Sequence, residues 1–290
     1  MSALGRAIQF DAAGLRLAGC AWGPTHGAPV LILHGFLDQG AAWHEVGARL
    51  ADALDRPVIA PDHRGHGLSD HVGPGGWYHF WDYVADVDAV VDQLGGLVDV
   101  VGHSMGGTVA SLFAACRPAK VRRLALIEGL GPPDGADHAL ERARAFLDER
   151  ATPPRHGVFA SPRDAAARLQ RQNDLEPELA LALAERVLVR HPEGWTWAWD
   201  ARHRGRSPTP FREDVHLAML AMVRAPTLLI EGQRSPWRPP GIEARRDVIA
   251  KARYMLLPAA GHNPHHDDPA SLAEVLADFL TPPTSDSRHG

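Results

Sequence analysis

The 290-residue sequence predicts an α/β fold in which helices cover both faces of a mostly parallel sheet. Three observations favour this class. Short apolar runs rich in β-branched residues occur at intervals along the chain and have the length of buried strands. Segments with helical spacing separate these runs. Polar or glycine-rich turns follow the ends of the runs. This alternation predicts parallel strands connected by helical crossovers.

The first part of the chain supplies most of this pattern. Residues 7–10 and 15–22 are expected to pair as two strands across the turn at residues 11–14. The elements after them keep the same alternation, and they are strand 30–33, helix 42–54, strand 57–60, helix 81–94, strand 97–101, helix 108–115 and strand 121–128. We therefore expect the sheet to begin with a hairpin and to continue with parallel strands.

The alternation stops after residue 128, where Gly129-Leu130-Gly131-Pro132-Pro133 breaks regular structure. From residue 134 to 223 the sequence has no buried parallel strand, and helices are expected at 138–149, 162–172 and 176–189. The pattern returns with strand 225–232, helix 242–251, strand 252–257 and helix 269–280. We therefore predict a core domain of residues 1–133 and 224–290, with residues 134–223 inserted as a helical cap.

Composition excludes several classes of partner. The net charge of −5 gives no reason to expect nucleic acid or an acidic membrane surface as a partner. No apolar stretch is long enough for a signal peptide or a membrane span, so a cytoplasmic location is expected. Cys20 and Cys116 are expected to be small core residues rather than a disulfide. The 17 histidines lack the usual zinc-motif spacings, so we predict no metal and no cofactor.

The most informative stretch is residues 101–107, Val-Gly-His-Ser-Met-Gly-Gly, which contains the pattern Gly-x-Ser-x-Gly. It lies directly between a predicted strand and a predicted helix. This context is typical of a nucleophile elbow, in which Gly102 and Gly106 permit a tight turn and Ser104 is exposed at its tip. Free N–H groups and the positive end of the helix dipole would stabilise an anion formed there.

Several polar residues follow predicted strands, and the carboxyl ends of parallel strands meet at one edge of a sheet. Ligands of such sheets bind beyond that edge. The residues expected there are Ser104, the His34-Gly35-Phe36 turn, Glu128, Glu231 and the loop around His262. The topology therefore predicts one site that includes all of them.

The chain resembles the α/β-hydrolase superfamily over nearly its whole length. The motifs that carry the resemblance are His34-Gly35-Phe36, residues 62–69 (Asp-His-Arg-Gly-His-Gly-Leu-Ser), residues 102–107 and Gly261-His262. A closer similarity is to the serine hydrolase-like branch, through residues 78–83, 126–132 and 199–202. The resemblance implies an α/β-hydrolase fold with an inserted cap.

The resemblance also implies a catalytic triad in the chain order Ser, acid, His. Ser104 is the expected nucleophile and His262 the expected base, while His265 and His266 are expected to line the loop or face solvent. The common position of the acid is occupied by Ser235, which carries no charge. Some relatives place the acid after the preceding strand, at the position of Glu128 here.

We therefore predict Glu128 as the acid, with Glu231 and then Asp134 as the alternatives. A carboxylate at this point would orient the imidazole and stabilise its charged form.

The family pattern places the oxyanion hole at the backbone N–H groups of Phe36 and Met105. Four tryptophans are candidates for the walls of a partly apolar substrate pocket, namely Trp195, Trp197, Trp199 and Trp237. We expect a serine hydrolase, specifically a carboxylesterase that acts on small to medium acyl esters as small-molecule substrates. The alternatives are a lactonase, an amidase, a C–C bond hydrolase, an acyltransferase or a non-catalytic ligand-binding protein on the same fold.

Overall fold

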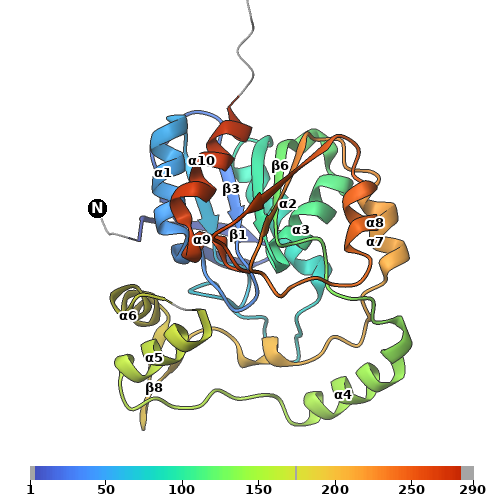
Figure 1. Cartoon of the computed structure of the whole chain (residues 1–290). Helices are drawn as coiled ribbons and strands as arrows, with labels where there is room; N and C mark the ends of the chain where they lie inside the picture. The colour runs from blue at the N-terminus through green and yellow to red at the C-terminus, as the bar shows by residue number, and fades with distance from the viewer. Residues whose placement is uncertain (1–3, 174, 282–290) are drawn as a thin grey trace, which may run out of the picture.

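The computed structural model describes residues 4–173 and 175–281 and contains an eight-stranded sheet between layers of helices (Figure 1). The strand order is β1-β2-β4-β3-β5-β6-β9-β10. The strands are β1 (Arg6–Ala12), β2 (Leu15–Trp22), β3 (Val30–Leu33), β4 (Val58–Pro61), β5 (Val98–His103), β6 (Val121–Ile127), β9 (Thr227–Gly232) and β10 (Ala252–Leu257). Only the β1/β2 and β2/β4 pairs of this sheet are antiparallel, which confirms the prediction of a mostly parallel sheet.

The central strands are buried on both faces, which explains their continuous apolar sequences. All four residues of β3 are buried. Val30 and Ile32 belong to one hydrophobic core, while Leu31 and Leu33 belong to the other, as the alternation of side chains along a strand requires. The first core includes helices α1 (His44–Leu54) and α10 (Pro269–Leu280), and the second includes α2 (Phe80–Gln93) and α3 (Met105–Cys116). The sheet is therefore covered on both sides.

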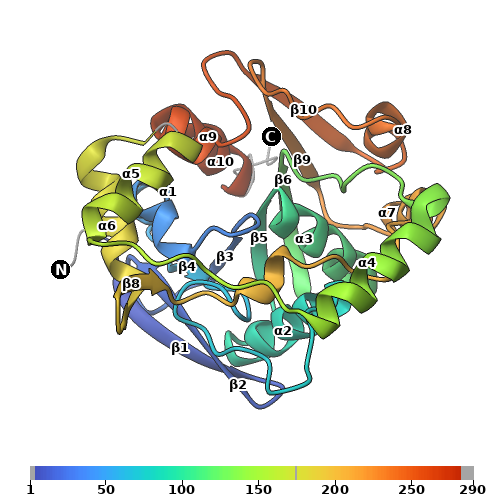
Figure 2. The ribbon, with the colours of Figure 1, turned by 90° about the horizontal axis from the view of Figure 1, so that it is seen from below.

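The predicted insertion lies across one end of the sheet (Figures 1 and 2). It contains α4 (Ala139–Ala151), α5 (Pro162–Asn173), α6 (Pro177–Arg186), the hairpin β7 (Leu188–His191) and β8 (Gly194–Trp197), and α7 (Glu213–Leu220). Buried side chains of α5 and α6 join the core that includes α1. Helix α7 packs against α3. The division of the chain into a core and a cap stays a prediction.

The structure corrects the sequence-based assignment at several elements. Helices α7 and α9 (Pro264–Asp267) were not expected, and α8 (Ile242–Asp247) ends earlier than the predicted 242–251. Helix α9 begins with proline directly after residues 261–263, and its single turn is too short to show the periodicity that identifies longer helices. Residues 1–3 and 282–290 of the predicted core range lie outside the described residues.

The structure also bears on two expectations from composition. Both cysteines are free, and Cys20 is buried, but Cys116 is exposed at the end of α3 and is not the core residue that was expected. Within residues 4–173 and 175–281, no helix combines the length and hydrophobicity that a membrane span requires.

Candidate active site

Ser104 occupies a sharp turn between the end of β5 and the start of α3. Its backbone adopts φ 51° and ψ −116°, a strained conformation for a residue with a side chain. The turn brings β3 and α3 into close approach, since a Cβ atom added at Gly106 would lie 2.2 Å from the Leu33 carbonyl oxygen. Gly102 also has no room for a side chain, because a Cβ atom added there would lie 2.5 Å from the Gly106 carbonyl oxygen. The glycines of the motif therefore allow the turn that exposes Ser104.

The three residues predicted as a triad are connected by hydrogen bonds. Ser104 Oγ lies 3.1 Å from His262 Nε2, and His262 Nδ1 lies 3.1 Å from Glu128 Oε2. A carboxylate accepts hydrogen bonds, so Nδ1 carries the ring proton and donates a hydrogen bond to Glu128. The lone pair of Nε2 then faces the Ser104 hydroxyl, and this is the tautomer that a general base requires.

Glu128 is held in place by donors on both carboxylate oxygens. Its side chain is 1% exposed. The Gly232 N–H donates to Oε1 at 2.8 Å, and the Ser235 hydroxyl donates to Oε2 at 2.7 Å. Burial acts to raise the pKa of Glu128, but the hydrogen bonds from His262, Ser235 and Gly232 outweigh it and hold this pKa below its ordinary value. Glu128 is therefore ionised at neutral pH.

The two alternative acids lie elsewhere. Glu231 accepts a hydrogen bond from Arg246 Nε at 2.8 Å, and its Oε2 lies 3.7 Å from Arg238 Nε. Asp134 accepts hydrogen bonds at 2.7 Å from the N–H groups of Ala136 and Glu213, the first residue of α7. Neither carboxylate contacts His262 among the interactions of the described residues, so Glu128 is the carboxylate beside the ring.

Ser235 is the residue at this site whose part sequence reasoning missed. From the sequence, Ser235 is only the uncharged residue at the common position of the acid. In the structure its hydroxyl contacts the same Glu128 oxygen as His262 Nδ1. The sequence could have suggested this role, because Ser235 occupies the position at which the family commonly has its acid. A residue at that position is expected near the imidazole whether or not it is charged.

Replacing Ser235 with alanine is expected to raise the pKa of Glu128 and to lower kcat/KM for hydrolysis about fivefold, because one hydrogen bond to the carboxylate is lost. The folded protein holds the pKa of Glu128 below its ordinary value of 4.5, so the ionised carboxylate stabilises the fold at pH values above 4.5. This contribution is lost as the pH falls through the lower pKa of the folded state. In Ser235→Ala the loss should therefore occur at higher pH. Carbon-13 NMR titration of the Glu128 carboxyl measures the shift, and an unchanged pKa would contradict this role.

The loop of the predicted oxyanion hole is held by His34. The ring accepts a hydrogen bond at Nε2 from the His63 N–H at 2.9 Å, so Nδ1 carries the proton and donates to the Gly35 carbonyl at 2.7 Å. Among the described residues, the Phe36 N–H that follows donates to no recorded partner. Met105 is the first residue of α3, where an N–H has no partner within the helix. Both N–H groups are thus available to an anion beside Ser104.

A cavity of about 530 Å³ opens at Ser104 and His262. This volume suits a small-molecule ligand. Three of the four candidate tryptophans, Trp197, Trp199 and Trp237, line it. Trp195 is not among the lining residues, and the Arg190 guanidinium lies 4.0 Å from the centre of its ring. Apolar side chains of α5, α6 and the segments next to them complete one wall, and these are Leu169, Leu175, Leu183 and Val187.

Three further histidines lie near His262. His103 Nε2 donates to the carbonyl oxygen of His262 at 2.7 Å, which ties the elbow to the loop of the base. His265 was expected to line the loop or to face solvent, and its exposure of 3% excludes the second alternative. Burial lowers the pKa of His265 to about 3, so this ring is neutral at neutral pH. His266 lines the cavity.

Comparisons with known proteins identify the family of this chain. A model of the α/β-hydrolase fold family matches residues 28–269. A serine hydrolase-like protein of Danio rerio is 30% identical over 287 residues, which cover 93% of this chain and 86% of that protein. Lipase LipV of Mycobacterium tuberculosis is 33% identical over 179 residues, which cover 60% of this chain and 62% of that protein.

Among solved structures, a thioesterase domain from the curacin biosynthetic pathway superposes with a TM-score of 0.86 and 32% identity, over 93% of this chain and 98% of that domain. The family match spans most of the sequence, and it confirms the fold that the motifs predicted. The chain therefore belongs to the α/β-hydrolase fold family, is similar to serine hydrolase-like proteins, and is a hydrolase.

Proposed function

We propose that this hydrolase is a carboxylesterase that cleaves small to medium acyl esters through an acyl-enzyme on Ser104. The observation that carries the proposal is the unbroken chain of hydrogen bonds from Ser104 Oγ through His262 to Glu128, with both contacts to the ring at 3.1 Å. A serine hydroxyl is a weak nucleophile at neutral pH, and this arrangement supplies the base and the anion that activate it.

In the first step, Ser104 Oγ attacks the ester carbonyl carbon while its proton passes to His262 Nε2. The carbonyl π-electrons move to oxygen, and the N–H groups of Phe36 and Met105 stabilise the resulting oxyanion. Glu128 stabilises the positive charge that develops on His262, because the carboxylate is ionised and accepts a hydrogen bond from Nδ1–H at 3.1 Å. When the tetrahedral intermediate collapses, the C–O bond breaks and the departing alcohol takes the proton from His262.

The second step regenerates the enzyme. Water enters the position of the alcohol, gives a proton to His262 Nε2 and attacks the acyl carbon. The bond to Ser104 Oγ then breaks, and the serine recovers its proton from His262. The products are the carboxylic acid and the free enzyme, so no group is consumed from the protein.

The substrate class rests on the cavity and on the relatives. A cavity of about 530 Å³ with one wall of leucine, valine and tryptophan side chains suits an acyl group of modest length. The similarity to lipase LipV favours an oxygen ester. The similarity to the curacin thioesterase domain favours a thioester, so thioester hydrolysis is the second candidate activity.

We expect a fluorophosphonate probe to label the native protein on Ser104, with loss of fluoride as Oγ bonds to phosphorus. Labelling requires an activated serine, so a non-catalytic ligand-binding protein would not react. Mass spectrometry of the digested protein identifies the labelled peptide, and the heat-denatured chain is the matched control. Absence of label on Ser104 in the native protein would reject the proposed mechanism.

A substrate panel separates the candidate activities. p-Nitrophenyl esters and N-acetylcysteamine thioesters with the same acyl groups compare oxygen with sulfur leaving groups, and kcat/KM is measured for each pair. We expect kcat/KM to be higher for the oxygen ester than for the thioester of the same acyl group. A preference for the thioesters would establish the second candidate, and labelling without turnover of either series would direct attention to lactones, amides or C–C bonds.

A further inference from the structure

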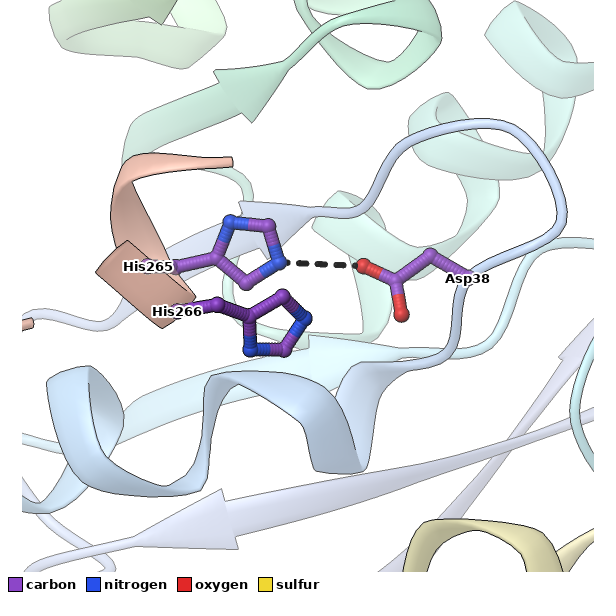
Figure 3. Close-up of side chains that lie close together, drawn as sticks. All are labelled: Asp38, His265 and His266. Carbon is purple, nitrogen blue, oxygen red and sulfur yellow. Dashed lines mark ion pairs between the residues drawn. The ribbon is translucent and has the colours of Figure 1, made fainter. Parts of the chain in front are cut away.

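A second cluster of potential ligands lies beside the catalytic pocket, outside the triad. It consists of Asp38, in the loop after β3, and His265 and His266 on α9. One ligand atom from each side chain lies within 4.8 Å of the others. Figure 3 shows the two imidazole rings and the carboxylate, with His265 facing Asp38. The distance from His265 Nε2 to Asp38 Oδ2 is 3.3 Å.

His265 is the fixed member of this cluster. Its ring stacks on Trp43 with 4.4 Å between ring centres and an interplanar angle of 3°. The side chain is 1% exposed, yet neither ring nitrogen makes a hydrogen bond with any described residue. The contact with Asp38 at 3.3 Å lacks the alignment that a hydrogen bond requires. A buried imidazole without hydrogen-bond partners is costly, and such groups in native proteins call for an explanation.

Asp38 presents the complementary problem. Its side chain is 21% exposed, and the side chain that lies 3.3 Å from its Oδ2 is the uncharged ring of His265. No lysine or arginine ion pair of the described residues involves Asp38. A largely buried carboxylate is stable when a cation compensates its charge. Because none of the described lysines or arginines pairs with Asp38, none of these cations compensates its charge. The side chains of His265 and His266 lie beside the same carboxylate.

We propose that Asp38, His265 and His266 bind one divalent transition-metal ion, with Zn²⁺ the best match. Two imidazole nitrogens and one carboxylate oxygen form a common three-ligand set for such ions, which leaves open positions for water or another ligand. This site departs from our sequence-based expectation of no metal.

The geometry requires a modest contraction of the cluster. In a tetrahedral zinc site with bonds of about 2.1 Å, the ligand atoms lie about 3.4 Å apart. The Asp38–His265 pair already meets this spacing at 3.3 Å. Rotation of the partly exposed His266 ring would bring in the third ligand. Asp38 and His266 also line the cavity that contains Ser104, so the open metal positions would face a molecule bound there.

The test is titration of the full-length, metal-free protein with Zn²⁺ by isothermal calorimetry. We expect one Zn²⁺ per chain, and an affinity at least about tenfold lower in His266→Ala and in Asp38→Asn. His26→Ala is the matched control, because His26 is exposed in the loop between β2 and β3 and should leave the affinity unchanged. Circular dichroism verifies that each variant is folded, and Asp38→Asn preserves the size of the side chain.

A second pair of variants separates this site from the triad. Ser104→Ala should bind Zn²⁺ as the wild type does, whether or not the esterase proposal is correct, because the assay does not depend on activity. Two results would overturn the metal site. One is absence of stoichiometric binding by the wild type, and the other is undiminished binding by His266→Ala and Asp38→Asn. If His262→Ala alone abolished binding, the ion would belong to the triad.

Discussion

Ser104→Ala is expected to lower kcat/KM for a p-nitrophenyl ester by at least about 10⁴-fold, because the nucleophile of the proposed acyl-enzyme is absent. The residual rate should be that of an enzyme that binds the ester and stabilises the oxyanion but forms no covalent intermediate. Steady-state kinetics measures the loss. The burst of p-nitrophenol that reports an acyl-enzyme should disappear with it.

The control for this experiment is Ser111→Ala. Ser111 lies on α3, two turns after Ser104, but it is buried and its hydroxyl donates to the Thr108 carbonyl at 2.8 Å, away from His262. This variant should keep its rate within about twofold while losing about 1 kcal/mol of stability with the hydrogen bond. Turnover by Ser104→Ala comparable to the wild type would refute the assignment of the nucleophile.

Glu128→Gln is expected to lower kcat/KM about 10⁴-fold, with little change in fold. The glutamine side chain has the same length, but it carries no charge to stabilise the imidazolium. Its amide group would also present donors to His262 Nδ1, which favours the wrong tautomer of the ring. Measurement of kcat/KM across pH, together with thermal unfolding, distinguishes this loss of catalysis from a loss of structure.

The neighbouring carboxylate provides the matched control. Glu231→Gln removes a negative charge from the next strand of the sheet, where Glu231 pairs with Arg246 and not with the imidazole. Its kcat/KM should stay within about threefold of the wild type. If the two variants lost activity equally, or if Glu231→Gln lost more, the choice of Glu128 as the acid would be wrong.

The shared contact of Ser235 and His262 with Glu128 Oε2 allows a rescue experiment. In the double variant Glu128→Ala/Ser235→Asp, a carboxylate stands at the position that is common in the family. We expect kcat/KM at least about tenfold above that of Glu128→Ala alone. A double variant no more active than Glu128→Ala would show that Ser235 is too distant to supply the charge.

Local patterns predicted the fold because each strand carries its own signal. The run Val-Leu-Ile-Leu at 30–33 is buried on both faces, and the turn at 102–106 needs its glycines for close approach. The short helix α9 was not predicted, because a single turn shows no periodicity. The burial of His265 was not predicted, because its stacking partner, Trp43, is more than 200 residues away in the chain.

The sequence by itself determined the order of the central strands and of most helices, and it placed Ser104 in the turn after a strand and His262 in the loop after the last strand. All of these follow from patterns a few residues long. Only the tertiary structure shows which of the carboxylates lies beside the His262 ring. The pairing of β6 with β9, with Ile127 beside Ile230, brings Glu128 to the Gly232–Ser235 turn and to the imidazole. That pairing joins segments about 100 residues apart, and contacts of this range depend on packing of the whole sheet, which no local pattern encodes.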